Sequence, residues 1–235
     1  GDGHDLIHYK ELGAEIHGVD ASEKFIEIAK GRLPNEDIRL GQCEKNPFGE
    51  NHFDVVLSKY AIQTSADLTP IIKEIKRILK PGGILMYLVT HPFRQYFEKR
   101  DDKADYFEQK VVDSHILNNS LIVKEPSHTL NEYLTKEFLL DFDIKFYQEY
   151  WDASAEQING KRYPGYFILK AHHTVSEITT KGKEVFGNEF NEKIFRTQLA
   201  FFEDIDYSEQ ISYKDGFAID DEIVKKTLIE FSLEI

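Results

Sequence analysis

The sequence is poor in cysteine, in long apolar runs and in basic charge. Cys43 is the only cysteine among 235 residues, which excludes an internal disulfide or a cysteine-based metal cluster and favours a reducing compartment. The longest apolar stretch, GGILMYLV at 82–89, is far shorter than the roughly 20 residues that cross a bilayer. Lys and Arg number 29 against 42 Asp and Glu, a net charge of -13 that disfavours nucleic-acid phosphates as ligands. We therefore expect a cytoplasmic protein with no membrane or nucleic-acid partner and with a small or cationic ligand.

The first half of the chain alternates strand-like and helix-like stretches. This alternation is typical of crossover units around a parallel sheet. Ser22 stands in the N-cap position of the first helix, whose broad apolar face includes Phe25 and Ile28, and KPGG at 80–83 ends the second helix. The last two strands are expected to be buried. The predicted strands cover 14–20, 37–42, 52–60 and 83–90, and the predicted helices cover 22–33 and 67–79.

The second half follows a different pattern. Residues 91–124 are charged and aromatic without a clean period, which is typical of an insertion over the edge of a sheet. A helix is predicted over 128–142, and strands over 144–153 and 165–173 are expected to form an antiparallel terminal pair. Together these stretches predict an α/β fold, with a mostly parallel sheet, helices on both faces and an antiparallel C-terminal strand pair.

Residues 174–235 form a second predicted unit, a small helical appendage beside a main domain over 1–173. This tail holds 14 acidic and 7 basic residues, and so a charge of -7 out of the total of -13. Its stretches QLAFFEDIDYS and DDEIVKKTLIEF faintly resemble the C-terminal part of abortive-infection nucleotidyltransferase toxins, whose catalytic glycine and paired-aspartate signature has no match in the sequence. We expect a docking or dimerisation segment, which leaves a homo-oligomer open.

A glycine-rich turn, GDGHDL, opens the sequence. Gly1 and Gly3 allow a ligand to approach the backbone closely, and the helix that follows supplies free N–H groups. Leu6 stands where a dinucleotide fold wants its third glycine, which weakens the interpretation as a nicotinamide enzyme. Asp20 ends the next predicted strand, where a carboxylate accepts hydrogen bonds from both hydroxyls of a ribose.

Two further predicted strands end in polar residues. GQCEKNPF places Gln42 and the backbone of Cys43 where they can bond an adenine edge, and LSKY ends the following strand with Ser58. The carboxyl ends of parallel strands are where open sheets bind ligands. The sequence therefore predicts a nucleoside site at this edge of the sheet.

Read together, these segments resemble the class I S-adenosylmethionine-dependent methyltransferases, in particular the small-molecule group related to the ubiquinone and menaquinone methyltransferases. The resemblance covers residues 1–173 and rests on GDG, GVDAS, GQCEKNPFGENHFDVVLS and IKRILKPGGIL in that order. It implies a Rossmann-like fold, S-adenosylmethionine as cofactor, S-adenosylhomocysteine as product, and methyl transfer to a small-molecule acceptor by in-line displacement. It assigns the cofactor site to Gly1, Gly3, Asp20, Ala21, Gln42, Cys43 and Ser58.

The sequence departs from the family pattern in two places. The family usually has Asp where Gln42 stands, and an amide can accept from the adenine amino group but without a charge-assisted bond. The sequence as given lacks the strand that normally precedes the glycine motif. We expect this strand to lie upstream of Gly1, and the alternative is a fragment whose cofactor site is incomplete at Gly1. A central strand cannot be removed without exposing two hydrogen-bonding edges and apolar surface.

Methyl transfer asks little of side chains, because the sulfonium is already activated and alignment of the nucleophile alone contributes roughly 7 to 11 kcal/mol. Two histidines are candidates for a general base. His91 in THPF comes directly after the predicted strand 83–90. Instead of a general base, it is in the alternative interpretation an ordinary loop histidine before a turn-forming proline. His128 in PSHTLNEY resembles a stretch that lies near the acceptor pocket in this group, and its alternative is simply the start of a helix.

The predicted substrate pocket is lined by Lys59, Tyr60 and Phe93. In the alternative interpretation, Lys59 is a solvated surface cation without a role in the pocket. We predict no metal site, because the adjacent His172 and His173 would point to opposite faces of a strand. Five aromatic residues either form a lid over an apolar acceptor or pack as ordinary core. They are Phe93, Tyr96, Phe97, Tyr106 and Phe107.

Two classes of function stay open at this point. One is an enzyme that methylates a small molecule. The other is a catalytically inactive binding or accessory module that retains the fold, which Gln42, the clipped glycine motif and the acidic tail suggest. The acceptor, and whether it reacts through oxygen, nitrogen or carbon, is open as well, because the variable region 91–165 has only a mixed aromatic and charged composition.

Overall fold

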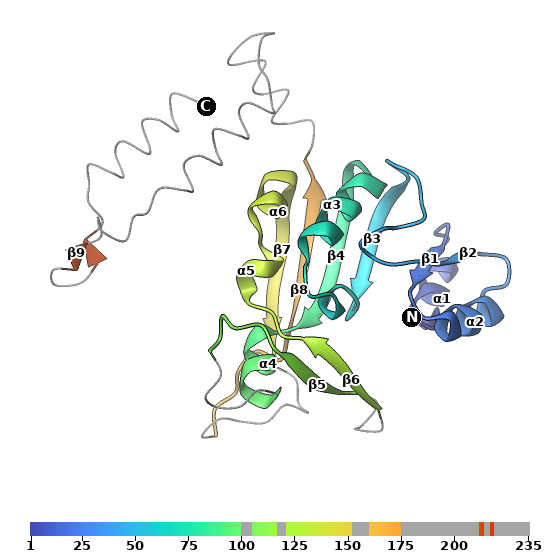
Figure 1. Cartoon of the computed structure of the whole chain (residues 1–235). Helices are drawn as coiled ribbons and strands as arrows, with labels where there is room; N and C mark the ends of the chain where they lie inside the picture. The colour runs from blue at the N-terminus through green and yellow to red at the C-terminus, as the bar shows by residue number, and fades with distance from the viewer. Residues whose placement is uncertain (100–104, 117–120, 152–159, 175–211, 214–216, 219–235) are drawn as a thin grey trace, which may run out of the picture. The chain divides into compact units, whose positions relative to one another are not determined.

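The computed structural model describes residues 1–99, 105–116, 121–151, 160–174, 212–213 and 217–218 (Figure 1). The chain divides into two units, Gly1–Thr174 and Val175–Ile235. In the second unit the described residues form a short antiparallel pair, β9 (Ser212–Tyr213) and β10 (Phe217–Ala218), so they are strands and not helix. The remainder of the predicted helical tail lies outside the described residues. Within the described part of the chain, no helix combines the length and the apolar character needed to span a membrane.

The larger sheet of the first unit has the strand order β3-β4-β8-β7. Strands β3 (Phe53–Lys59) and β4 (Leu79–Thr90) are parallel. Strand β8 (Tyr166–His173) runs antiparallel to β4 and to β7 (Phe142–Tyr150). The predicted α/β fold with an antiparallel C-terminal strand pair is therefore confirmed.

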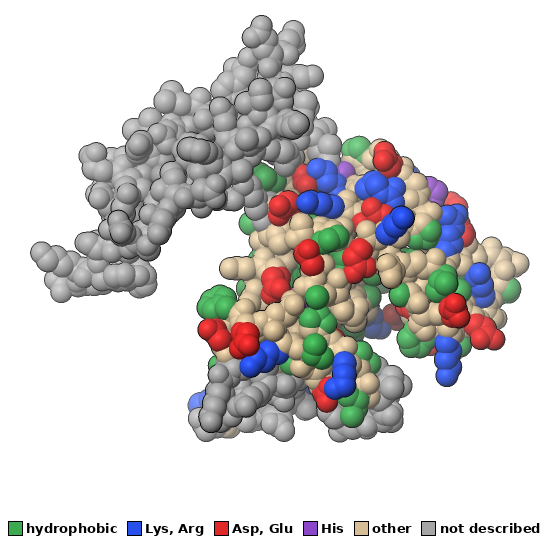
Figure 2. Space-filling view, viewed as in Figure 1, with side chains coloured by type: hydrophobic (Ala, Val, Ile, Leu, Met, Phe, Trp, Pro, Cys, Tyr) green, Lys and Arg blue, Asp and Glu red, His purple; other side chains and the backbone are tan. Residues whose placement is uncertain are grey.

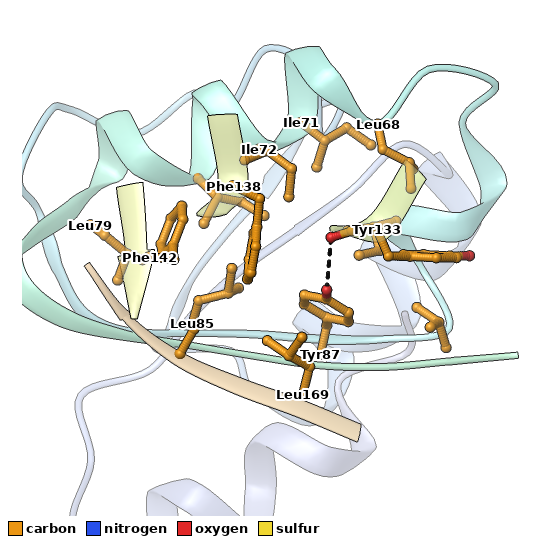
Figure 3. Packing of buried hydrophobic residues seen from close by; sticks show 14 of the residues in the cluster. Leu68, Ile71, Ile72, Leu79, Leu85, Tyr87, Tyr133, Phe138, Phe142 and Leu169 are labelled. Carbon is orange, nitrogen blue, oxygen red and sulfur yellow. Dashed lines mark hydrogen bonds between the residues drawn. The ribbon is translucent and has the colours of Figure 1, made fainter. Parts of the chain in front are cut away.

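One face of this sheet carries the main hydrophobic core. Helix α3 (Thr69–Ile78) packs its isoleucines against alternate residues of β4 and β8, as Figure 3 shows. Below them, the buried Tyr87 hydroxyl donates to the carbonyl of Tyr133 at 3.2 Å. The side chains that α3, β4 and β8 contribute, each at most 6% exposed, are Ile71, Ile72, Ile75, Leu79, Leu85, Tyr87, Val89, Phe167, Leu169 and Ala171.

The predicted helix over 128–142 is two helices, α5 (Leu130–Tyr133) and α6 (Lys136–Asp141). Thr129 begins the first in a capping box with Glu132. Thr135 begins the second, because its side chain accepts the backbone N–H of Phe138 at 3.2 Å. A second N-cap inside an apolar stretch starts a new helix, which the periodicity alone did not reveal.

Strand β3 is less buried than predicted. Val55 is 46% exposed and Leu57 is 40% exposed. Strand β3 is one of the two edge strands of the described sheet, and these two side chains alternate with Val56, which packs against the core under α3. The prediction of a buried strand rested on apolar composition, which does not distinguish a central strand from an uncovered one.

The strands before β3 form a separate parallel pair, β1 (His17–Asp20) with β2 (Asp37–Leu40). Helix α1 (His4–Glu11) precedes β1 in the chain, and helix α2 (Glu23–Arg32) connects β1 to β2. The side chain of Ser22 accepts the N–H of Phe25 at 3.4 Å, which confirms the predicted N-cap. The apolar face of α2 is narrower than predicted, because Phe25 is 43% and Ile28 is 36% exposed.

The region after β4 contains more regular structure than predicted. Helix α4 (Pro92–Lys99) follows β4 directly. Strands β5 (Val111–Ile116) and β6 (Leu121–Pro126) then pair as an antiparallel hairpin below the larger sheet in Figure 1. A short 3-10 turn, η1 (Ile62–Thr64), follows β3. The lack of a clean period in 91–124 did not reveal these elements, because charged and aromatic residues on a hairpin and a short helix mask the period.

We predict that Phe138→Ala lowers the free energy of unfolding by about 3 to 5 kcal/mol, because the ring is completely buried in the main core. The neighbouring Leu139→Ala is the matched control, because Leu139 is 55% exposed and surface changes stay within about 0.5 kcal/mol. Urea denaturation of both variants measures the difference. Equal losses in the two variants would contradict the packing described here.

Candidate functional site

The glycine turn leads directly into α1. Gly3 is the N-cap of that helix, with a left-handed backbone at φ 77°. A Cβ atom on Gly3 would lie 3.1 Å from the Cβ of Ala29 on α2. Both the backbone conformation and the close approach of α2 therefore require glycine at this position. Gly1 is exposed, and a Cβ atom there would meet nothing within 4 Å.

Asp20 ends β1 beside this turn. Its Oδ1 accepts the backbone N–H of Ser22 at 2.8 Å, and its Oδ2 contacts the amino group of Gly1. The carboxylate is partly exposed, and Ala21 follows it at the surface. Three of the predicted cofactor residues thus lie together at the end of β1.

The loop after β2 returns to the same place. The N–H of Gly41 donates to the carbonyl of Asp20 at 3.0 Å, so Gln42 and Cys43 begin beside the end of β1. The Gln42 carbonyl accepts the N–H of Lys45 at 3.2 Å, which closes a tight turn. The Gln42 side chain is exposed, whereas Cys43 packs against the main core. Burial raises the pKa of the Cys43 thiol, and neighbouring carboxylates add to this effect.

Strand β3 ends in Ser58 and Lys59, and Tyr60 follows it. The Ser58 hydroxyl is buried and bonds to none of the described groups. Lys59 Nζ pairs with the Asp5 carboxylate at 2.9 Å, which ties the end of β3 to α1. Tyr60 is 42% exposed and holds a left-handed backbone at φ 53°, a strained conformation for a residue with a side chain. An unpaired buried hydroxyl next to a strained residue is a feature of ligand-binding positions.

His91 lies at the end of β4 and is 2% exposed. Its Nδ1 accepts the N–H of Phe93 at 3.1 Å, which leaves the ring proton on Nε2. Nε2 then donates to the carboxylate of Glu149 on β7 at 3.0 Å. Burial lowers the pKa of His91, and the Glu149 carboxylate opposes this shift. The neutral imidazole therefore uses both nitrogens to join β4, α4 and β7.

His128 belongs to a buried polar network that the sequence did not predict. Its Nε2 donates to the carbonyl of Gln63 at 3.0 Å, and its backbone N–H donates to the side chain of Gln95 at 3.0 Å. The Gln63 amide donates to Glu125 at 2.7 Å and to Thr90 at 3.0 Å. This network joins η1, β4, α4 and β6. The available signal was the presence of glutamines inside apolar stretches, but their partners lie far away in the sequence.

The aromatic residues after β4 form an exposed cluster. Phe93 is 43%, Phe97 is 46% and Phe107 is 75% exposed, so the alternative that these three pack as ordinary core is wrong. The Tyr106 ring lies 5.9 Å from the rings of both Phe93 and Tyr96 and connects the cluster. An apolar surface is thus available beside the end of β4.

The described part of the chain holds no group of three His, Cys, Asp or Glu side chains that could bind a metal ion. His173 is buried, and its Nδ1 bonds the carbonyl of Lys80 at 3.2 Å. His172 is half-buried on the opposite face of β8.

We predict that His91 makes the fold less stable on mild acidification. The fold holds the imidazole neutral, whereas the unfolded chain takes up a proton below a pKa of about 6.5, so unfolding binds protons there. The difference in unfolding free energy between wild type and His91→Gln should therefore shrink as the pH falls below about 6.5. Chemical denaturation at several pH values measures this difference. A difference that is independent of pH would contradict the neutral, buried state.

Comparison with known proteins places these residues in a family context. Residues 1–87 match the family described as "Methyltransferase domain". An uncharacterized methyltransferase of Synechocystis sp. is 38% identical over 93 residues, which is 39% of this chain and 44% of the relative. A demethylmenaquinone methyltransferase of Lactococcus lactis is 36% identical over 104 residues, covering 40% of this chain and 41% of the relative. The chain thus spans less than half the length of these curated relatives.

Solved structures confirm the fold over a longer stretch. An S-adenosylmethionine-dependent methyltransferase from Mesorhizobium loti superposes with a TM-score of 0.59 at 19% identity, covering 74% of this chain and 87% of that chain. The predicted Rossmann-like fold class is therefore confirmed. The sequence match and the fold agree with the resemblance described above: residues 1–87 match the methyltransferase domain family, and the fold is that of solved S-adenosylmethionine-dependent methyltransferases.

Proposed function

We propose that this chain binds S-adenosylmethionine and transfers its methyl group to a small-molecule acceptor. The observation that carries the proposal is the convergence of Asp20, the loop from Gly41 and the helix that follows the glycine turn. The N–H of Gly41 donates to the carbonyl of Asp20, and Leu6 of α1 lies against Gly18 of β1. These segments all lie within the stretch that matches the methyltransferase domain. An acidic strand end between a glycine turn and a polar loop suits an adenosine ligand.

The residues at this site suit the polar groups of the cofactor. Asp20 offers a partly exposed carboxylate for the ribose hydroxyls, and Gly3, which is buried against Ala29, sets the turn that leads into α1. The exposed amide of Gln42 can accept from the adenine amino group. The unpaired hydroxyl of Ser58 supports a contact with the methionine part, because a buried hydroxyl without a partner costs about 1 to 3 kcal/mol. Ala21, beside Asp20, suits a contact with the adenine.

S-adenosylmethionine supplies an activated methyl group on its sulfonium sulfur. The task of the chain is then to hold the acceptor in line and to exclude water, and alignment alone contributes about 7 to 11 kcal/mol. We assign Lys59, Tyr60 and Phe93 to the acceptor side. Lys59 pairs with Asp5 at 2.9 Å, which places its charge near the end of β3.

We infer that His91 and His128 position the acceptor side and do not exchange a proton. A general base needs a free lone pair facing the acceptor. The Nδ1 lone pair of His91 is occupied by a backbone N–H, and its Nε2 proton is held by Glu149. His128 has a completely buried side chain, with Nε2 bonded to Gln63. Both histidines are thereby suited to fixing the geometry of α4 and of the segment before α5.

The acceptor is expected to be small and at least partly apolar. The exposed aromatic cluster of Phe93, Phe97 and Phe107 offers apolar surface beside the end of β4. Relatives named demethylmenaquinone methyltransferases point in the same direction. Nucleic acid is not the expected partner, because acidic and basic side chains are interspersed on the face shown in Figure 2. A cytoplasmic location and oligomerisation through the tail remain predictions.

We predict that Asp20→Ala weakens the binding of S-adenosylhomocysteine by at least about tenfold, because charged hydrogen bonds to the ribose would be lost. Asp54→Ala is the matched control, because Asp54 lies at the opposite end of β3 in an exposed pair with Lys80. Titration calorimetry measures both dissociation constants. Equal affinity in the two variants would show that the assignment of Asp20 to the ribose is wrong. If wild type released no binding heat at millimolar ligand, the proposed function would be wrong.

A further inference from the structure

Two side chains of α3 hold the loop that runs from Gly41 to Phe48. The Nη2 of Arg77 donates to the carbonyl of Phe48 at 2.8 Å and to the carbonyl of Asn46 at 3.2 Å. Glu74 Oε1 accepts the backbone N–H of Asn46 at 2.7 Å. We call Glu74 and Arg77 the clamp. It holds three backbone groups in the part of the loop that follows the tight turn.

The two side chains of the clamp also form a bidentate ion pair with each other. Arg77 donates from Nε to Glu74 Oε2 at 2.8 Å and from Nη2 to Glu74 Oε1 at 2.6 Å. The side chains are 14% exposed for Glu74 and 30% exposed for Arg77. The hydrogen bond from Arg77 lowers the pKa of Glu74, so the carboxylate stays charged. A bidentate, half-buried pair of this kind has a fixed geometry, unlike an exposed ion pair.

The strand before the loop holds it from the other side. The guanidinium of Arg39 donates to the carbonyl of Pro47 at 2.9 Å and lies 4.3 Å from the centre of the Phe48 ring. A Cβ atom on Gly41 would lie only 2.8 Å from Pro47, so the loop folds back on its own start. Movement at Pro47 would therefore be transmitted to Gly41 and to the adjoining Gln42.

We propose that Glu74 and Arg77 are positioning residues for the cofactor, acting through the loop that carries Gln42 and Cys43. This inference rests on the proposed function. The clamp fixes the loop from outside the cofactor site, because its side chains bond the backbone of Asn46 and Phe48 and not Gln42 or Cys43. The planar fork of arginine makes two carbonyl contacts and a bidentate carboxylate contact at once, which lysine cannot reproduce. Residues of α3 thus preorganise the adenine side of the site.

The test uses the full chain with Arg77→Lys and Glu74→Gln, which keep size and polarity. Lys76→Met is the matched control, because Lys76 is the adjacent residue of α3, is similarly exposed and pairs with Asp141 away from the loop. Titration calorimetry gives the dissociation constant of S-adenosylhomocysteine. Hydrogen exchange of the Asn46 amide in the absence of ligand reports the clamp itself.

We expect Arg77→Lys and Glu74→Gln to weaken S-adenosylhomocysteine binding about tenfold and to accelerate exchange of the Asn46 amide, while Lys76→Met changes neither. The loss of affinity in a clamp variant should also be less than additive with the loss in Gln42→Ala, because both changes act on the proposed contact between Gln42 and the cofactor. If the clamp has a purely structural role, the losses of affinity add in the double variant. Additive losses would overturn the proposal.

Two other outcomes are informative. Faster exchange of the Asn46 amide with unchanged affinity would show that the clamp orders the loop without positioning the cofactor, and this result would overturn the inference alone. No binding by wild type would overturn the proposed function and with it the cofactor role, while the exchange rates would still show whether the clamp orders the loop.

Discussion

The pairing of β4 with β3 on one side and β8 on the other is the interaction on which the rest of the structure depends. Leu85, Tyr87 and Val89 of β4 are at most 1% exposed and form the floor of the main core. Because β3 is parallel to β4, both strands end at the same edge, which brings Ser58 and His91 to one side of the sheet. Helix α3 packs on the same core, and its outer residues hold the loop before β3.

Much of this fold could be predicted from the sequence, because local signals and burial agree there. The cap at Ser22, the isoleucines of α3 and the alternation in β8 each specify one element without help from distant residues. The predictions were wrong where distant context decides. The exposure of Val55 depends on which strands and helices cover β3, and the hairpin β5–β6 is stabilised by pairing between two strands of mixed polar and aliphatic composition.

The candidate site also contains residues that local sequence signals suggest and residues whose roles depend on distant contacts. The sequence suggests Asp20, Gln42 and Ser58 for the site because each lies at or near the end of a strand, and the ends of parallel strands gather at one edge. The roles of His91 and Glu125 could not be predicted, because their hydrogen bonds join residues far apart in the chain. The same holds for Arg77, which looks like an exposed helical cation until its contacts with Phe48 and Glu74 are known.

The central claim is that three strand ends build one cofactor site. A crystal structure of the protein with S-adenosylhomocysteine tests it most directly. We predict the ribose on the Asp20 carboxylate, the adenine against Gln42 and Cys43, and the homocysteine part within reach of the Ser58 hydroxyl. A ligand bound elsewhere, or a ribose that does not contact Asp20, would contradict this account.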